Sequence, residues 1–111
     1  MIKPIPERLL IHTIQYEEFT RDGAFGEEFK PIVTIPFVLV QPKTQIRRND
    51  AGEEIEIKAI VFIDALNTPN AQPLKEKSKV YFNNREWRVK SCESLYALNP
   101  TAPHHYEVML T

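Results

Sequence analysis

The chain has 111 residues, the size of one small domain, and its content of 42% hydrophobic and 26% charged residues is ordinary for a globular protein. Its net charge of −1 argues against a domain that grips nucleic acid mainly through phosphates, because such domains carry a strong basic excess. The single cysteine, Cys92, excludes an internal disulfide, and no apolar run approaches the ~20 residues of a membrane helix. We therefore expect one domain over residues 1–111, with no membrane partner, made and folded in a reducing cytoplasm.

The first third of the chain predicts an arm, a strand and a loop. Residues 1–7 contain Pro4 and Pro6 and predict a stiff, extended N-terminal arm. Residues 9–16 predict a strand, and the polar segment 17–28, which contains two glycines, predicts a loop.

The middle of the chain predicts two strands joined by a long connection. Residues 30–40 are rich in β-branched side chains and predict a strand, although Pro36 must lie at an edge, a bulge or a break. Residues 41–53 are polar and contain the turn sequence Asn-Asp-Ala-Gly, so we expect a long loop there. This loop exceeds what a tight hairpin needs, and long loops in small domains often carry function. Residues 54–64 alternate clearly and predict the longest strand.

The last third predicts a loop over residues 65–77, a hairpin from residue 79 that extends to about residue 95, and a short closing strand over residues 105–110. Asn83-Asn84 suits a two-residue turn, because asparagine tolerates positive φ better than most residues. The resulting register places one apolar set on the core face of the hairpin: Val80, Phe82, Trp87 and Val89. Short strands ended by Pro, Asn or Gly predict an all-β fold, a small antiparallel barrel or sandwich of about six strands with a long projecting loop.

We find no motif for catalysis or for a cofactor. The chain has no nucleophile elbow, no zinc-protease signature and no glycine-rich phosphate loop, so we expect no catalytic residues and no enzyme activity. His104 and His105 are adjacent in a predicted strand and would point to opposite faces, which disfavours a shared metal ion. We therefore expect no metal and no cofactor.

Several segments resemble the small minor capsid proteins of tailed bacteriophages that infect low-GC Gram-positive bacteria, a family related to head-completion proteins. The resemblance runs over residues 3–10, 50–53, 59–64, 79–90 and 104–108. Members of the family often have Gly where this chain has Asn84, and Tyr where it has Trp87. Both differences keep the local chemistry.

The resemblance implies a structural role at the neck of the virion, as a ring that joins head to tail and helps retain packaged DNA. It implies four kinds of partner: copies of the same chain, portal or adaptor proteins on the head side, a tail-completion protein on the tail side, and non-specific contact with DNA. By position, the loop that faces the channel would contain Lys43, Gln45, Arg47, Arg48, Asn49 and Asp50.

Two other functions remain open from the sequence. A small barrel that binds nucleic acid, like an OB-fold module, is suggested by the strand number and by Tyr81 among basic residues of the hairpin. A protein that completes the tail rather than the head is equally compatible with the sequence.

Overall fold

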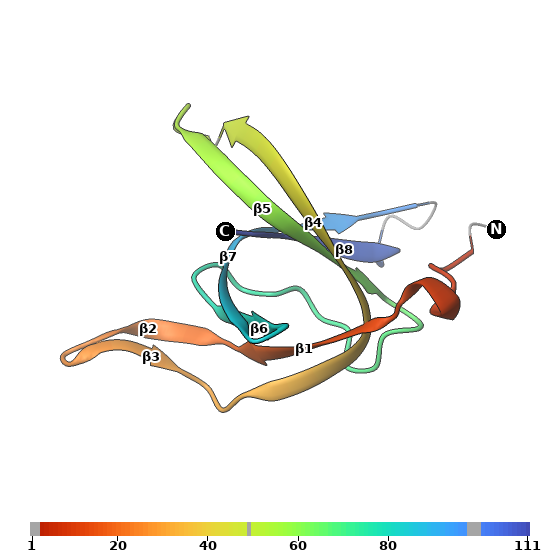
Figure 1. Ribbon diagram of the computed structural model, residues 1–111, viewed down its shortest axis with the longest axis horizontal. Helices are drawn as coiled ribbons and strands as arrows, with labels where there is room; N and C mark the ends of the chain where they lie inside the picture. The colour runs from red at the N-terminus through yellow and green to blue at the C-terminus, as the bar shows by residue number, and fades with distance from the viewer. Residues whose placement is uncertain (1–2, 49, 98–100) are drawn as a thin grey trace.

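Six antiparallel strands form a closed barrel in the computed structural model, which describes residues 3–48, 50–97 and 101–111. The order around the barrel is β1-β4-β5-β8-β7-β6, and β6 pairs with β1 to close it. A separate two-stranded sheet, β2-β3, leaves the barrel after β1 (Figure 1). The elements are a 3-10 turn η1 (Glu7–Leu9), β1 (His12–Glu17), β2 (Phe19–Gly23), β3 (Gly26–Phe29), β4 (Val33–Arg48), β5 (Glu54–Asp64), β6 (Lys79–Phe82), β7 (Arg85–Leu95) and β8 (His105–Leu110).

The barrel interior is filled by alternate side chains of all six strands. The core residues with no exposed surface include Ile14, Ile35, Val61 and Val108. The four residues predicted to form the core face of the hairpin do so: Val80, Trp87 and Val89 lie in this core, and Phe82 packs against it. The all-β fold predicted from the sequence is confirmed, and of the two alternatives, barrel and sandwich, the structure has the barrel. In the described part of the chain the only helix is the short turn η1, and none is long and apolar enough to cross a membrane.

The β6-β7 hairpin has the register that its sequence predicts. Val80 pairs with Trp87 and Phe82 with Arg85, and the turn residues Asn83 and Asn84 have φ angles of 55° and 61°. Both turn residues are therefore in the left-handed region that a type I′ turn needs.

Replacing Asn84 with alanine is expected to lower the free energy of unfolding by about 1 kcal/mol, because alanine lacks the local hydrogen bonding that helps asparagine tolerate positive φ. Urea denaturation followed by Trp87 fluorescence measures the change. The matched variant Asn84→Gly should stay within about 0.5 kcal/mol of the wild type, since glycine adopts this conformation freely. Equal stabilities for the alanine and glycine variants would contradict this account of the turn.

Strand β4 contains the predicted break at Pro36. Between His12 and Ile14 of β1, the partner residues on β4 change from Val38 to Ile35, so β4 carries an extra residue there. The bulge includes Phe37, whose φ is +56°. Pro36 is accommodated at this bulge, where its missing N–H does not interrupt the ladder.

Two segments predicted as loops are strands, and the predictions are corrected here. Residues 19–23 and 26–29 form the β2-β3 hairpin, and residues 41–48 continue β4, so only residues 49–53 lie between β4 and β5. The missed strands have polar side chains on most positions of both faces, because they lie largely outside the barrel. Hydrophobic alternation appears only where one face is buried.

Candidate functional site

Two ribbons of paired strands extend away from the barrel in different directions (Figure 1). The first ribbon is the distal part of β4 and β5 over residues 45–57. We call it the arm, and it is distinct from the N-terminal arm. Gln45 pairs with Ile57 and Arg48 with Glu54, whereas β5 pairs with β8 only from Ala59 onward. The arm is therefore a two-stranded extension beyond the closed barrel, and it contains the predicted channel-facing residues except Lys43, which lies at its base.

The tip of the arm is braced by Arg48. Its guanidinium donates to the Gly52 carbonyl at 3.0 Å and to a Glu54 carboxylate oxygen at 3.4 Å. Gly52 has a φ of +82°, which explains a glycine in this turn. Arg48 therefore holds the turn in shape, a role that the sequence did not predict for it.

The other residues of the predicted channel segment are distributed along the arm. Lys43 lies beside the register shift between Pro42 and Gln45, and Asp50 lies in the turn. The side chains of Gln45 and Arg47, and all of Asn49, fall outside the described part of the chain. Ile46 is two-thirds exposed on the arm.

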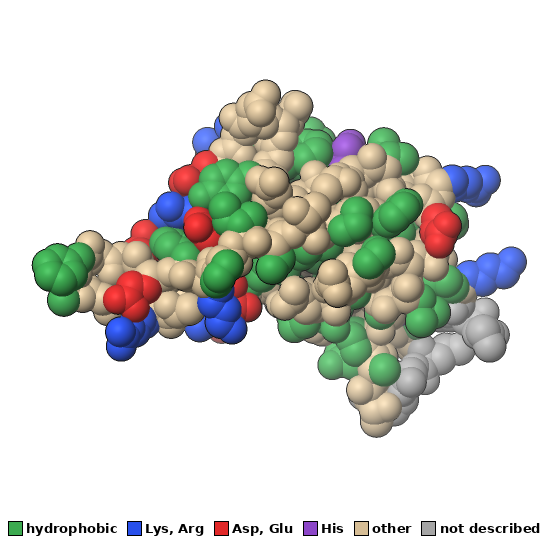
Figure 2. All heavy atoms as spheres, turned by 90° about the horizontal axis from the view of Figure 1, so that it is seen from below, with side chains coloured by type: hydrophobic (Ala, Val, Ile, Leu, Met, Phe, Trp, Pro, Cys, Tyr) green, Lys and Arg blue, Asp and Glu red, His purple; other side chains and the backbone are tan. Residues whose placement is uncertain are grey.

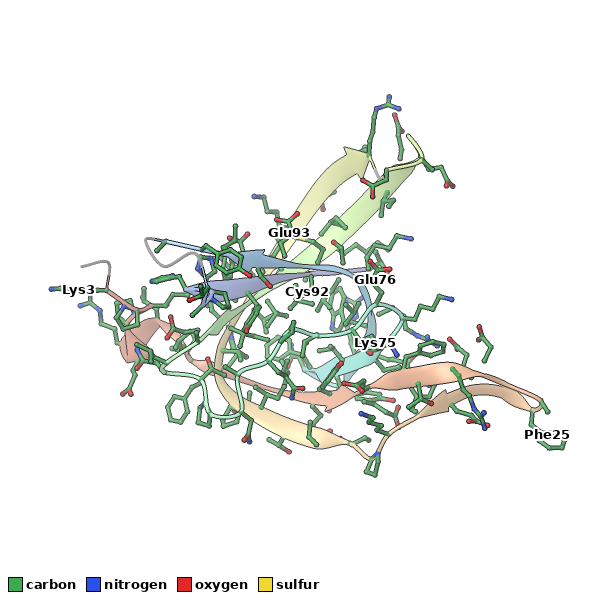
Figure 3. The ribbon with its side chains drawn as sticks, turned by 180° about the vertical axis from the view of Figure 1, so that it is seen from behind. Lys3, Phe25, Lys75, Glu76, Cys92 and Glu93 are labelled. Carbon is green, nitrogen blue, oxygen red and sulfur yellow. The ribbon has the colours of Figure 1, made fainter. Side chains whose placement is uncertain are left out.

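An open groove of about 340 Å³ lies between the arm and the body of the barrel. Figure 3 labels two residues of its wall, Glu76 and Glu93. The other lining residues are Arg48, Asp50, Ile55, Ile57, Lys90 and Ser91. Acidic and basic side chains alternate around it, which gives no single charge for an anionic or cationic ligand.

The second ribbon, the β2-β3 hairpin, is clamped to the barrel by ion pairs. Arg88 of β7 donates to both carboxylate oxygens of Glu27, at 2.9 and 3.1 Å, and this contact lowers the pKa of Glu27. Lys30 pairs with Glu18 at 2.8 Å at the root of the hairpin and lowers the pKa of that carboxyl. Arg88 and Lys79 also lie over the Phe29 ring. These contacts fix the direction in which the hairpin projects.

A buried hydrogen-bond network holds the point where the hairpin leaves β1. The Ser78 hydroxyl oxygen accepts from the Phe19 backbone N–H at 2.9 Å, and the Tyr16 hydroxyl accepts from the Lys75 N–H at 2.9 Å. Tyr16 and Ser78 are themselves 3.4 Å apart. Burial raises the pKa of Tyr16, so its hydroxyl stays protonated at neutral pH.

Two basic residues near Tyr81, Lys79 and Arg88, are paired with carboxylates. Tyr81 donates to Glu17 at 2.9 Å, and burial, followed by that contact, raises its pKa. Lys79 lies 3.7 Å from Glu86, and Arg88 is held by Glu27. An open groove of about 610 Å³ passes beside Tyr81, with polar walls from β1, β4 and the Asn83-Asn84 turn. Lys79 and Arg88 are therefore less available to a nucleic acid at this surface, whereas Arg85, which lies over the Trp87 ring, also lines the groove.

The adjacent histidines meet each other, contrary to the prediction that they point to opposite faces. Their Nδ1 atoms are 2.8 Å apart, because β8 begins at His105 and His104 lies before the strand. His104 donates from Nε2 to the Lys3 carbonyl, and His105 contacts a Glu107 carboxylate at 3.1 Å. In the described residues, no group of three or more potential ligands could hold a metal ion.

The N-terminal arm is attached to the barrel of its own chain. The Ile5 N–H donates to the buried Asp64 carboxylate at 2.8 Å, and Asn67 donates to the Ile5 carbonyl at 2.7 Å. The same carboxylate accepts from the N–H groups of Leu66 and Asn67. A single buried acid therefore fixes both the N-terminal arm and the turn after β5.

Comparison with known protein families assigns the chain to one of them. A family model described as "Minor capsid protein" matches residues 6–110. The chain belongs to this family of phage minor capsid proteins. A search of curated proteins gave no significant match. The match covers the barrel and both projecting ribbons, so the resemblance noted in the sequence is confirmed at the level of the family.

This minor capsid protein is a structural component of a virion. Its two ribbons are the features that were predicted least accurately from the sequence. The arm was found only as an over-long loop, and the β2-β3 hairpin was missed. The sequence contained a weak signal for the hairpin. Gly23 and Gly26 flank its turn, and Phe19 and Phe29, which pack edge to face at its root, lie on either side of this glycine pair in the sequence.

Proposed function

We propose that this minor capsid protein is a non-enzymatic connector of the phage neck, a ring component that helps join head to tail and retain packaged DNA. The observation that carries the proposal is the arm over residues 45–57, a braced two-stranded extension from a closed barrel. A connector needs surfaces that contact neighbours and a projection that can reach a channel, and it needs no catalytic pocket. Its neighbours would be copies of itself, portal or adaptor proteins on the head side and a tail-completion protein on the tail side.

The charge of the arm indicates that it would retain DNA by obstructing the channel rather than by binding to the DNA. Residues 45–57 carry two basic residues and four acidic ones: Arg47, Arg48, Asp50, Glu53, Glu54 and Glu56. Binding to phosphates requires a surplus of positive charge, and its strength falls steeply with salt. An arm with two basic and four acidic residues, a net charge of −2, would hold DNA by occupying space in the channel rather than by binding phosphates.

The test is to shorten the arm in the phage genome. Residues 46–56 are replaced by Asn-Gly, which joins the paired residues Gln45 and Ile57 through a two-residue turn. The barrel should fold, because the core residue Ile57 and the β5-β8 pairing are kept. We expect particles with heads and tails joined but with DNA lost from the heads, measured as nuclease-protected genome per particle and as empty heads in electron micrographs.

Two controls separate the parts of the proposal. Deleting the whole gene should give unjoined heads and tails. Arg48→Ala, which removes the brace but keeps the arm, should retain more DNA than the shortened variant. Full, infectious particles from the shortened variant would exclude a role in DNA retention. Joined particles from the gene deletion would exclude the connector role altogether.

A further inference from the structure

The tip of the β2-β3 hairpin presents one large apolar side chain to solvent. Gly23 and Gly26 are paired, which leaves Ala24-Phe25 as the turn, and Phe25 is fully exposed. Figure 3 shows Phe25 at the extreme end of the hairpin, pointing away from the body. A fully exposed phenylalanine on a projecting turn contributes nothing to the fold of its own chain.

The hairpin is held rigidly behind this tip. Its charged side chains are paired: Arg21 with Glu28 at 2.7 Å, Glu27 with Arg88, and Lys30 with Glu18. A ribbon fixed in this way loses little conformational entropy when its tip binds, which is the condition under which a single aromatic anchor is most effective. Because these charges are satisfied within the chain, the tip offers an apolar contact rather than an electrostatic one.

The opposite end of the molecule carries the complementary apolar surface, which we call the apolar end. Phe37 in the β4 bulge and Leu66 in the turn after β5 lie close together, because Thr68 donates to the Phe37 carbonyl. Leu9 and Ile11 adjoin them, since η1 packs against β4 and β1 begins beside the bulge. All four side chains are between about half and three-quarters exposed. In Figure 2 the hairpin ends in a hydrophobic side chain, and further hydrophobic groups cover the body away from it.

The two surfaces lie at opposite ends of the longest dimension of the chain, which measures 48 Å. Figure 3 shows this separation, with Phe25 at one end and Lys3, on the N-terminal arm, at the other. They cannot meet within one rigid molecule, so they can meet only between two copies.

The exposed area of the chain leaves enough surface for one interface of standard size. A compact monomer of 12.9 kDa exposes about 6,300 Å², whereas this chain exposes 7242 Å². The excess of about 900 Å² is close to the ~800 Å² that each partner buries in a standard interface.

We propose that copies of the chain associate head to tail, with Phe25 of one copy packed on the apolar end of the next, formed by Leu9, Ile11, Phe37 and Leu66. This contact joins two different surfaces, so it is heterologous and repeats from copy to copy, closing into a ring where the rotation between copies permits. The inference deepens the proposed connector role by naming the surfaces through which copies of the ring would meet. In this arrangement the arm is left free of the subunit contact.

Cross-linking of purified chain tests the contact directly. In a Cys92→Ser background, the pair Phe25→Cys and Leu66→Cys is treated with a short bis-maleimide. We expect a ladder of covalent oligomers beyond the dimer, because each copy then carries both halves of the contact. The control pair, Phe25→Cys with Ile46→Cys, uses a similarly exposed position on the arm and should give no ladder. Each single-cysteine variant should remain monomeric on denaturing gels.

Sedimentation of the uncross-linked chain over a range of concentrations supplies the second measurement. Wild type should associate reversibly, Phe25→Ser and Leu66→Ser should each weaken association by about tenfold or more, and Ile46→Ser should leave it unchanged. Dimers from Phe25→Cys alone would mean tip-to-tip contact and overturn the proposal. So would equal ladders from the test and control pairs, or a wild type that stays monomeric throughout together with a Phe25→Cys/Leu66→Cys pair that forms no ladder. These experiments use the purified chain without other virion proteins. A negative result would therefore overturn the proposed contact between copies without deciding the DNA-retention test of the connector role.

Discussion

Replacing Asp64 with alanine is expected to lower the free energy of unfolding by about 3 kcal/mol or more. The side chain is fully buried, and its two oxygens accept the backbone N–H groups of Ile5, Leu66 and Asn67 at 2.8 to 3.0 Å. Each donor left without a partner in a buried site costs about 1–3 kcal/mol. For a domain of this size the melting temperature should fall by roughly 10 °C or more.

Urea denaturation and thermal melting measure this loss. Asp22→Ala is the matched control, because Asp22 is exposed and lies 4.0 Å from its partner Lys77, so it should change stability by less than about 0.5 kcal/mol. Asp64→Asn keeps the shape and one acceptor oxygen, and should be intermediate. If Asp64→Ala proved as stable as Asp22→Ala, the carboxylate would not be what holds the N-terminal arm and the turn after β5.

Removing the Ser78 hydroxyl is expected to cost about 1–3 kcal/mol and to loosen the β2-β3 hairpin selectively. Ser78→Ala deletes the acceptor of the buried Phe19 N–H, where the chain turns out of the barrel. Tyr16→Phe removes the acceptor of the Lys75 N–H in the same network and should have a similar effect. Because the two hydroxyls contact each other, the double variant should lose less than the two single variants combined.

Hydrogen exchange distinguishes local loosening from general destabilisation. In Ser78→Ala, backbone amides of residues 19–29 should exchange faster relative to those of the barrel strands, because the hairpin opens without the barrel. Ser94→Ala, at an exposed position of β7, is the control and should leave the exchange pattern unchanged. Uniform acceleration over the whole chain would show that the network supports the barrel as a whole rather than the root of the hairpin.

The barrel was predictable where burial imposes a period of two. Strand β5 was located at its observed bounds, and so was β8, because one face of each is packed into the core. The β6-β7 register followed from two asparagines that can adopt positive φ. These signals are local: they need only the side-chain alternation and the conformational preference of a turn.

The remaining features depend on residues far apart in the sequence. The Arg88–Glu27 clamp joins positions 61 residues apart, and Asp64 binds Ile5 across 59 residues. A buried aspartate is unusual, so no feature of the sequence distinguished Asp64 from the surface acids. The candidate arm was placed by its length, but the role of Arg48 as a brace could be recognised only once the turn at Gly52 was seen.

The position of β8 has a consequence for how the chain is synthesised. It is the last strand in chain order, yet it lies between β5 and β7 and pairs with both. Until residues 105–110 leave the ribosome, β5 and β7 have unpaired edges and the barrel core lacks Val108 and Leu110. The barrel therefore closes only after β8 has been translated, and a product that stops before β8 would expose two strand edges to aggregation and proteolysis. Folding to the closed barrel thus depends on translation through β8.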